Sequence, residues 1–130
     1  MDDLRTRIHA ACIPVLDRFT DALDAHDAAT MDALMHFPHV RLAQGKVAVC
    51  DAPGRNPMDL FQRLKADDDW LYSRWGRRDL VQCSDVKAHY AVDYTRFRSD
   101  GSVIGVYESL YVLALVDGRW GVLARSSFGP

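Results

Sequence analysis

Apolar side chains recur every three or four positions at the start of the chain, from about residue 3 to residue 26. This spacing predicts one amphipathic helix with a buried stripe, and Pro14 predicts either a kink in it or a boundary between two segments. A second, short helix is expected after Asp27, whose carboxylate can cap it, with Pro38 at its end. A third helix is expected from Pro57 to about Lys65, because proline suits the first helical position.

The period of the apolar positions changes from helical to alternating beyond Trp70. Before that point, residues 40 to 49 already predict two short strands that turn at Gln44-Gly45. Helices followed by a run of strands is the order of an α+β fold. Because the later strands exceed the usual length of about 5 or 6 residues, we expect a strongly curved antiparallel sheet that forms a cone with the helices. These strands are expected at about 78–83, 85–98, 102–116 and 119–128.

Two Asp-Gly pairs set the expected register of the last three strands. Asp100-Gly101 and Asp117-Gly118 each lie between alternating apolar runs, which is the strongest short-range signal for a β-hairpin. If each pair is the centre of a two-residue turn, Asp93 lies directly opposite Glu108, and Arg125 falls on the same face of the sheet as Glu108.

This register predicts a sheet with two apolar faces, one with a titratable centre and one rich in tyrosine. Neither resembles the water-facing side that an antiparallel sheet of a monomer usually has, so we expect both to be covered. We assign the titratable face to the concave side under the helices and the tyrosine-rich face to a homodimer interface, where tyrosine is enriched. The reverse assignment is the main structural alternative. The candidate site residues of the titratable face are His89, Asp93, Glu108, Leu110, Leu123, Arg125 and Ser127.

The titratable face offers groups for acid–base chemistry. Two carboxylates directly opposite on a sheet repel, so inside a cavity either Asp93 or Glu108 is expected to keep its proton unless Arg125 compensates. His89, Asp93 and Glu108 are therefore the candidate catalytic residues. The alternatives are a satisfied ion pair or a solvated strand end for the carboxylates, and a histidine bonded to a neighbour for His89.

Size and charge narrow the classes of partner. The chain has 130 residues, 48% of them hydrophobic, and we expect one domain over residues 1–130. A net charge of −2 with intermixed signs lacks the basic surface that nucleic-acid binding requires. No apolar run reaches the ~20 residues that span a bilayer, and the acidic start differs from a signal peptide, so we expect a cytoplasmic protein without membrane contact. Three cysteines without a CxxC motif predict reduced thiols, and no motif indicates a cofactor or a metal.

Four segments follow one another in an order seen in a known superfamily. They are the long first helix, the second helix leading into residues 35–42, the helix after Pro57 and the closing Asp117–Val122. In this order the chain resembles the nuclear transport factor 2-like (NTF2-like) superfamily, which includes ketosteroid isomerase, scytalone dehydratase and SnoaL-like cyclases. Residues 124–128 and 87–89 resemble an uncharacterised bacterial branch of it. The resemblance covers essentially the whole chain and implies a cystatin-like α+β cone, a fold that hosts isomerases, dehydratases, hydrolases and binding proteins.

The resemblance also implies where a pocket lies, namely between the first helix and the concave side of the sheet. His39 and Arg41 share one side of the first strand and are expected to line it, and Trp70 and Trp75 are expected at its rim. In the ketosteroid isomerase branch a general-base Asp follows the second helix and a Tyr contributes to the oxyanion hole. Here that position carries no carboxylate and the first helix has no Tyr, so the alternative is His39 or His89 as base, oriented by a neighbouring carboxylate.

Two functions remain open from the sequence. The first is a small-molecule-binding protein of unknown ligand, or an enzyme of the isomerase or dehydratase type, whose partly apolar ligand bears an anionic or carbonyl group held by Arg41 and Arg125. The second is a non-catalytic homodimeric interaction module whose interior is filled by Phe97, Leu110 and Leu123. The first function predicts a closed cavity of roughly a few hundred Å³. Connected empty volume that touches both His89 and Arg125 favours this function, and a packed interior favours the second.

Overall fold

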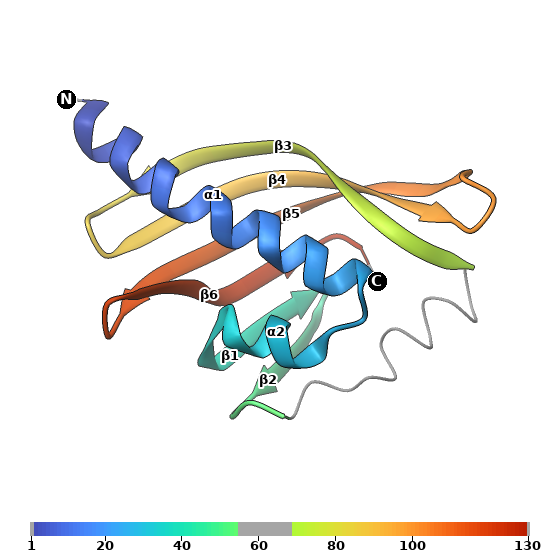
Figure 1. Cartoon of the computed structure of the whole chain (residues 1–130), viewed down its shortest axis with the longest axis horizontal. Coiled ribbons are helices and arrows are strands. Elements are labelled where there is room, and N and C mark those ends of the chain that lie inside the picture. Colours follow the sequence, from blue (N-terminus) through green and yellow to red (C-terminus); the bar gives the residue numbers. More distant parts are fainter. Residues whose placement is uncertain (1, 55–68, 130) are drawn as a thin grey trace.

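The computed structural model describes residues 2–54 and 69–129 and has the expected α+β architecture (Figure 1). The described helices are α1 (Asp2–Asp24) and α2 (Ala28–Ala33), and neither is long and apolar enough to cross a membrane. The helix expected over residues 57–65 lies outside the described residues. The strands are β1 (Met35–Ala43), β2 (Lys46–Cys50), β3 (Trp70–Cys83), β4 (Lys87–Arg98), β5 (Val103–Val116) and β6 (Arg119–Ser127).

Helix α1 is the amphipathic helix expected at the start of the chain. It runs through Pro14 as one element, so the chain does not divide into two segments there. Its apolar stripe packs into the core of the molecule, with Cys12, Leu16 and Phe19 almost completely buried. The helical spacing of these residues therefore reports the face that meets the sheet.

Helix α2 starts as expected and ends earlier than expected. The Asp27 carboxylate accepts hydrogen bonds from the Thr30 backbone N–H at 3.1 Å and from its hydroxyl at 2.6 Å, which is an N-cap. The helix ends at Ala33 rather than at Pro38, because the chain is already extended from Met35 onward as strand β1. A proline disfavours the helical conformation in the residue before it, and the extended segment is consistent with that preference.

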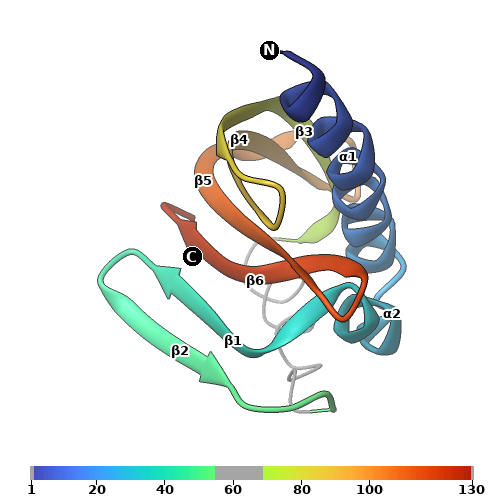
Figure 2. The ribbon, with the colours of Figure 1, turned by 90° about the vertical axis from the view of Figure 1, so that its left-hand side faces the viewer.

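The strands form one six-stranded sheet in the order β2-β1-β6-β5-β4-β3. The short pair expected around Gln44-Gly45 is present as β1 and β2. All neighbours are antiparallel except β1 and β6, which pair in parallel and so correct the expectation of a wholly antiparallel sheet. These two strands are far apart in sequence, so no hairpin dictates their relative direction. The sheet curls strongly, and α1 lies along its concave side (Figure 2).

The β4–β5 hairpin keeps the expected register over most of its length. Asp93 pairs with Glu108, as the position of the Asp-Gly turn predicted. The loop itself is longer than expected, because Arg98 N–H donates to the Ser102 carbonyl at 2.8 Å and the three residues between them form the turn. A bulge next to Arg96 compensates for the additional loop residue and restores the register further along the hairpin.

The β5–β6 hairpin turns at Asp117-Gly118, as expected. Both residues have positive φ, 52° and 74°, as a two-residue type I′ turn requires. Close to the turn, Leu113 lies opposite Val122 in the expected register.

A bulge in β6 then changes the register of everything that follows. Leu123 is an additional residue without a partner of its own on β5, so Arg125 pairs with Tyr111 rather than with Leu110. Because successive side chains of a strand point to opposite faces, a slip of one residue reverses them. Arg125 and Ser127 therefore face the side opposite to the one predicted from the turn.

Helix α1 covers the tyrosine-rich face, so the expected assignment of faces was wrong and the reverse assignment is correct. Tyr90 and Tyr111 are 0% and 7% exposed in the core that α1 contributes to. Phe19 of α1 meets the Tyr111 ring edge-on, with centroids 6.0 Å apart. The predicted homodimer interface over this face is also wrong, because the chain's own helix occupies it. Alternation along β4 and β5 places His89, Asp93, Glu108 and Leu110 on the outer face instead.

Candidate functional site

A cavity lies between α1 and the concave face of the sheet. Its volume is about 50 Å³, which leaves room for a few waters or a short organic molecule. Its wall is both aromatic and polar. Residues of α1 and of strands β1, β3, β4, β5 and β6 form it. The lining residues are Phe19, Thr20, Leu23, Arg41, Ser73, Trp75, Tyr94, Arg96, Ser109, Tyr111, Arg125 and Ser127.

The charged residues that line this cavity are all arginines. Arg41 and Arg125 are direct neighbours on the parallel strands β1 and β6, and Arg96 comes from β4 with 6% of its surface exposed. Among the described residues that form the wall there is no Asp or Glu. The cavity therefore presents concentrated positive charge beside aromatic rings.

His39 holds Arg125 in place. The Nε–H of Arg125 donates to His39 Nε2 at 3.0 Å, and His39 Nδ1 lies 3.1 Å from the Val122 carbonyl oxygen. Since the carbonyl can only accept and the guanidinium can only donate, the His39 proton must sit on Nδ1. Burial, followed by the positive charge of Arg125, lowers the pKa of His39 from 6.5 to about 4. The imidazole is neutral at neutral pH and keeps both nitrogens engaged.

Aromatic rings stack against the guanidinium groups of Arg125 and Arg96. The Arg125 guanidinium carbon lies 5.2 Å from the centroid of the Phe19 ring. The Arg96 guanidinium lies over both Tyr94, at 5.6 Å, and Tyr107, at 4.9 Å. Such cation–π contacts orient a cation without neutralising it.

The arginines also influence one another. Burial is the largest cause that lowers the pKa of Arg41, and the charges of Arg125 and Arg96 lower it further. Burial raises the pKa of the Tyr111 phenol, which therefore stays protonated and can donate. The polar wall is completed by hydroxyls, because Tyr94 Oη and Ser127 Oγ are 3.0 Å apart.

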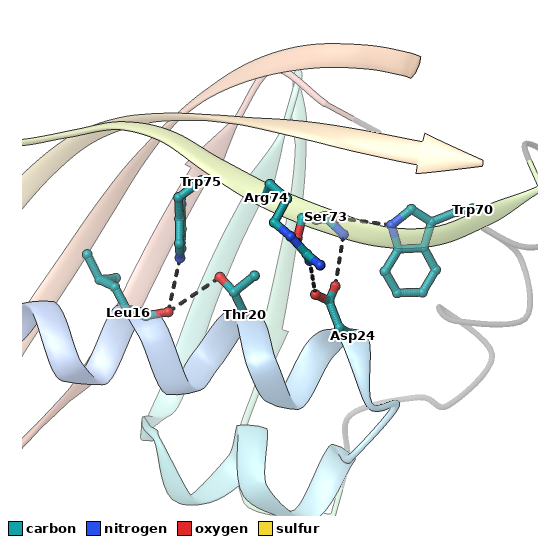
Figure 3. A network of polar contacts seen from close by, with 7 residues as sticks. All are labelled: Leu16, Thr20, Asp24, Trp70, Ser73, Arg74 and Trp75. Atoms are coloured by element: carbon teal, nitrogen blue, oxygen red, sulfur yellow. Dashed lines mark hydrogen bonds and ion pairs between the residues drawn. The ribbon is translucent and has the colours of Figure 1, made fainter. Parts of the chain in front are cut away.

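A network of polar contacts fastens α1 to β3 on one side of the cavity (Figure 3). Trp75 Nε1–H donates to the Leu16 carbonyl of α1 at 3.1 Å. The Asp24 carboxylate accepts from the Ser73 backbone N–H and from the Arg74 guanidinium, both at 2.8 Å. Burial is the main cause that raises the pKa of Asp24. Trp75 thus forms a wall whose position is set by the helix.

Some of the predicted site residues meet in this cavity. Arg41, Trp75, Arg125 and Ser127 line it, and His39 contacts Arg125 from behind. Trp70 does not line it, since its ring is buried and stacked on His26 at a centroid distance of 5.3 Å. The expected register put Arg125 and Ser127 on the same face as Glu108, and that face is the outer one. The bulge in β6 turns both residues to the concave face instead, so they line the cavity.

The remaining predicted residues lie away from the cavity, which corrects the expected convergence of acids and His89 with Arg125. Asp93 and Glu108 are opposite each other as expected, but on the outer face, where Asp93 accepts from the Arg77 backbone N–H at 3.0 Å. Glu108 is 3.8 Å from the Arg77 guanidinium and 73% exposed. His89 Nδ1 lies 2.8 Å from the Gln82 side-chain oxygen. Leu110 is exposed on the same outer face, and Leu123 is the residue of the bulge.

The sequence reasoning missed the cavity residues Tyr94, Arg96, Ser109 and Tyr111. One signal could have found them. Arg96 lies on the same face of its strand as Tyr94 and Val92, and this face is otherwise apolar. Because charged residues are almost never fully buried without a partner, a charged residue on such a face rarely serves packing alone. Its meaning depended on knowing that this face was the concave one.

Solved structures match this chain over nearly its whole length, whereas no protein-family model and no curated protein matches it. An NTF2-like protein with a cystatin-like fold from Novosphingobium aromaticivorans shares 16% identity at a TM-score of 0.74, with 95% of this chain and 84% of that chain covered. A ketosteroid isomerase-like protein from Erwinia carotovora atroseptica shares 18% at a TM-score of 0.64, with 93% and 96% covered. An NTF2-like protein of unknown function from Shewanella oneidensis shares 12% at a TM-score of 0.71, with 91% and 96% covered.

These identities are low, so the similarity concerns the path of the backbone and not the residues of a site. Within that scope the resemblance expected from the sequence is confirmed. The chain has the cystatin-like α+β fold of NTF2-like proteins.

Proposed function

We propose that this chain is a small-molecule-binding protein whose ligand occupies the cavity between α1 and the concave face of the sheet. The observation that carries the proposal is a cavity in which aromatic and polar side chains converge from α1 and from the sheet. Ligand sites of proteins combine an apolar wall with a few polar groups of this kind. NTF2-like neighbours share the fold within which this cavity lies.

Binding is favoured over proton-transfer chemistry by the groups in the cavity. A general base needs a free lone pair near the substrate at the working pH. The described wall has no carboxylate, and His39 is neutral but already accepts from Arg125. The interaction module with a filled interior is less well supported, since Phe97, Leu110 and Leu123 do not line the cavity.

A thermal-shift screen with a matched pair of variants tests this function. Ser109→Phe places a ring into the cavity, whereas Val106→Phe places the same ring on the outer face of the same strand, where Val106 is 63% exposed. Small molecules that raise the Tm of the native chain and of Val106→Phe, but not of Ser109→Phe, are the expected result. Thr20→Phe blocks the cavity from α1 and serves as second variant if Ser109→Phe does not fold. A broad library without any such molecule would contradict the proposal.

We further propose a homodimer formed through the outer face rather than the tyrosine-rich face. Leu42, Val47, Val49 and Leu110 are between 37% and 68% exposed on β1, β2 and β5, and their partners across the sheet place them on the side away from α1. An apolar surface spread over several strands of one sheet is typical of a protein–protein contact. A second copy presents the same surface and can therefore cover it symmetrically.

A further inference from the structure

We propose that the ligand is a small organic carboxylate whose charged group is held by Arg41, Arg96 and Arg125, with His39 as the positioning residue of Arg125. The inference rests on the proposed function and names the class of molecule that the cavity selects. The body of this molecule lies against the aromatic side of the wall.

Two like charges lie directly beside each other at the cavity wall. Arg41 and Arg125 are partners in the β1–β6 register, and both line the cavity beneath α1. Like charges directly opposite one another on neighbouring strands destabilise a sheet, and burial increases the repulsion. An anion bound between the two guanidiniums removes this repulsion, so the free energy of the pair favours an anionic ligand.

Acidic residues lie close to the cavity but pair with other arginines. A neighbouring groove, which shares Thr20 and Trp75 with the cavity, is lined by Asp17, Asp21 and Asp24 of α1. There Asp24 pairs with Arg74 at 2.8 Å, and Asp17 pairs with Arg78. Asp17 and Asp24 of α1 are therefore paired with arginines that do not line the cavity.

The side chain of Arg125 has a fixed orientation. Its Nε–H is committed to His39 Nε2 at 3.0 Å, and Phe19 lies 5.2 Å from its guanidinium carbon. The four N–H groups of the two terminal nitrogens are not used by His39. Because a guanidinium held in this way loses little further freedom on binding, it is suited to the planar, two-oxygen geometry of a carboxylate.

The size and the apolar wall of the cavity select the body of the ligand. Phe19, Leu23, Trp75 and Tyr111 form the apolar wall of the same cavity. A cavity volume of about 50 Å³ suits a short aliphatic body. A carboxylate on such a body matches the two kinds of surface that the cavity offers.

The test compares acids with their neutral amides by isothermal titration calorimetry. The acids are acetate, butyrate and benzoate, the amides are acetamide, butyramide and benzamide, and inorganic phosphate is included. At least one acid is expected to bind at least about tenfold more tightly than its amide and than phosphate, with an affinity that falls as salt is added. Equal binding of acids and amides, tighter binding of phosphate, or no binding of any acid would overturn the carboxylate assignment.

Arginine variants locate the charge that recognises the acid. Arg41→Gln, Arg96→Gln and Arg125→Gln are each expected to weaken acid binding about tenfold or more and to leave amide binding nearly unchanged. Arg77→Gln removes the same charge from the outer face, where Arg77 contacts Asp79 and Glu108, and is expected to have no effect. An equal loss of affinity in Arg77→Gln would mean that net charge, and not the cavity, attracts the acid.

A separate pair of variants tests the role of His39. In His39→Gln the side-chain amide can still accept from Arg125 and donate to the Val122 carbonyl, whereas His39→Leu can do neither. We expect the ratio of acid to amide affinity to persist in His39→Gln and to fall about tenfold in His39→Leu. A merely structural role would lower the Tm of His39→Leu without changing this ratio.

The failure of this inference and that of the proposed function have different signatures. Neutral molecules that bind the native chain and Val106→Phe but not Ser109→Phe, and that bind at least as tightly as every acid, would uphold the proposed function and overturn the carboxylate assignment. Acid binding that persists in Ser109→Phe would place the acid outside the cavity and overturn both.

Discussion

His39 illustrates how one side chain can be useful because it carries no charge. Its exposure is 1%, and it stands beside Arg125, so a proton on the ring would be repelled as well as desolvated. The neutral Nδ1–H tautomer is the form that satisfies both the Val122 carbonyl and the Arg125 Nε–H. The residue that the sequence suggested as a base therefore serves the structure as an acceptor.

The lowered pKa of His39 predicts a pH dependence of stability. In the unfolded chain the imidazole takes up a proton near pH 6.5, whereas in the folded chain it does so only near pH 4. The unfolded state thus binds more protons in this window, so the free energy of unfolding falls as the pH falls from about 6.5 to about 4. The shift corresponds to roughly 3 kcal/mol at most.

Urea unfolding between pH 7 and pH 4 measures this effect against His39→Gln, which lacks the titrating group and retains acceptor and donor. As the pH is lowered, the free energy of unfolding of the native chain is expected to fall more than that of the variant. A constant difference across the window would mean that His39 titrates alike in both states.

At the scale of elements, the bulge at Leu123 decides which side chains enter the cavity. Without it, Arg125 would lie opposite Leu110 on the outer face, as the turn at Asp117-Gly118 predicts. With it, Arg125 lies opposite Tyr111 and beside Arg41. A single additional residue therefore brings two arginines from different strands to one point.

The link between α1 and β3 is the second element-scale feature. Trp75→Phe keeps a ring in the wall but loses the hydrogen bond from Nε1 to the Leu16 carbonyl. A loss of about 1 kcal/mol in the free energy of unfolding is expected from urea titration, with an unchanged m-value. A variant as stable as the native chain would show that the contact does not fasten the helix.

At the scale of the whole molecule, both faces of the sheet are apolar but only one is covered by the chain's described helices. Helix α1 buries the tyrosine-rich face. On the outer face, the side chains of Leu42, Val47, Val49 and Leu110 are exposed to solvent. The proposed homodimer follows from this asymmetry, because water-facing apolar surface of this extent is unusual for a monomer.

Leu110→Arg tests the dimer in the middle of the outer face. Light scattering coupled to size exclusion is expected to give the mass of two chains for the native protein and of one chain for the variant, because a buried like-charge pair would form at a symmetric interface. Val86→Arg, in the turn between β3 and β4, where Val86 is 52% exposed, is the control and is expected to stay dimeric. A native protein with the mass of one chain would contradict the proposal.

Local sequence signals were sufficient for much of the fold. The helical period of α1, the cap at Asp27, the turn at Asp117-Gly118 and the pairing of Asp93 with Glu108 each depend on a few neighbouring residues and appear as predicted. Within the site, Arg41 and Arg125 were identified by residue type. Arg125 was expected beside Glu108, whereas in the structure it lies beside Arg41. The acid–base candidates His89, Asp93 and Glu108 were chosen because they share a face of the sheet. That face is the outer one, whereas the cavity lies on the concave face.

The sequence by itself determined the order of the described elements, the register of the β5–β6 hairpin near its turn and that of the β4–β5 hairpin beyond its bulge, since these follow from periodicity and turn chemistry within short segments. Only the tertiary structure decided which side of the sheet is hollow. Both faces carry enough apolar side chains to be buried, so the choice depends on where α1 packs. The residue at the bulge is a leucine, and the one glycine of β6, Gly121, pairs in the expected register, so the slip that turns Arg125 inward is visible only when β1, β5 and β6 are assembled.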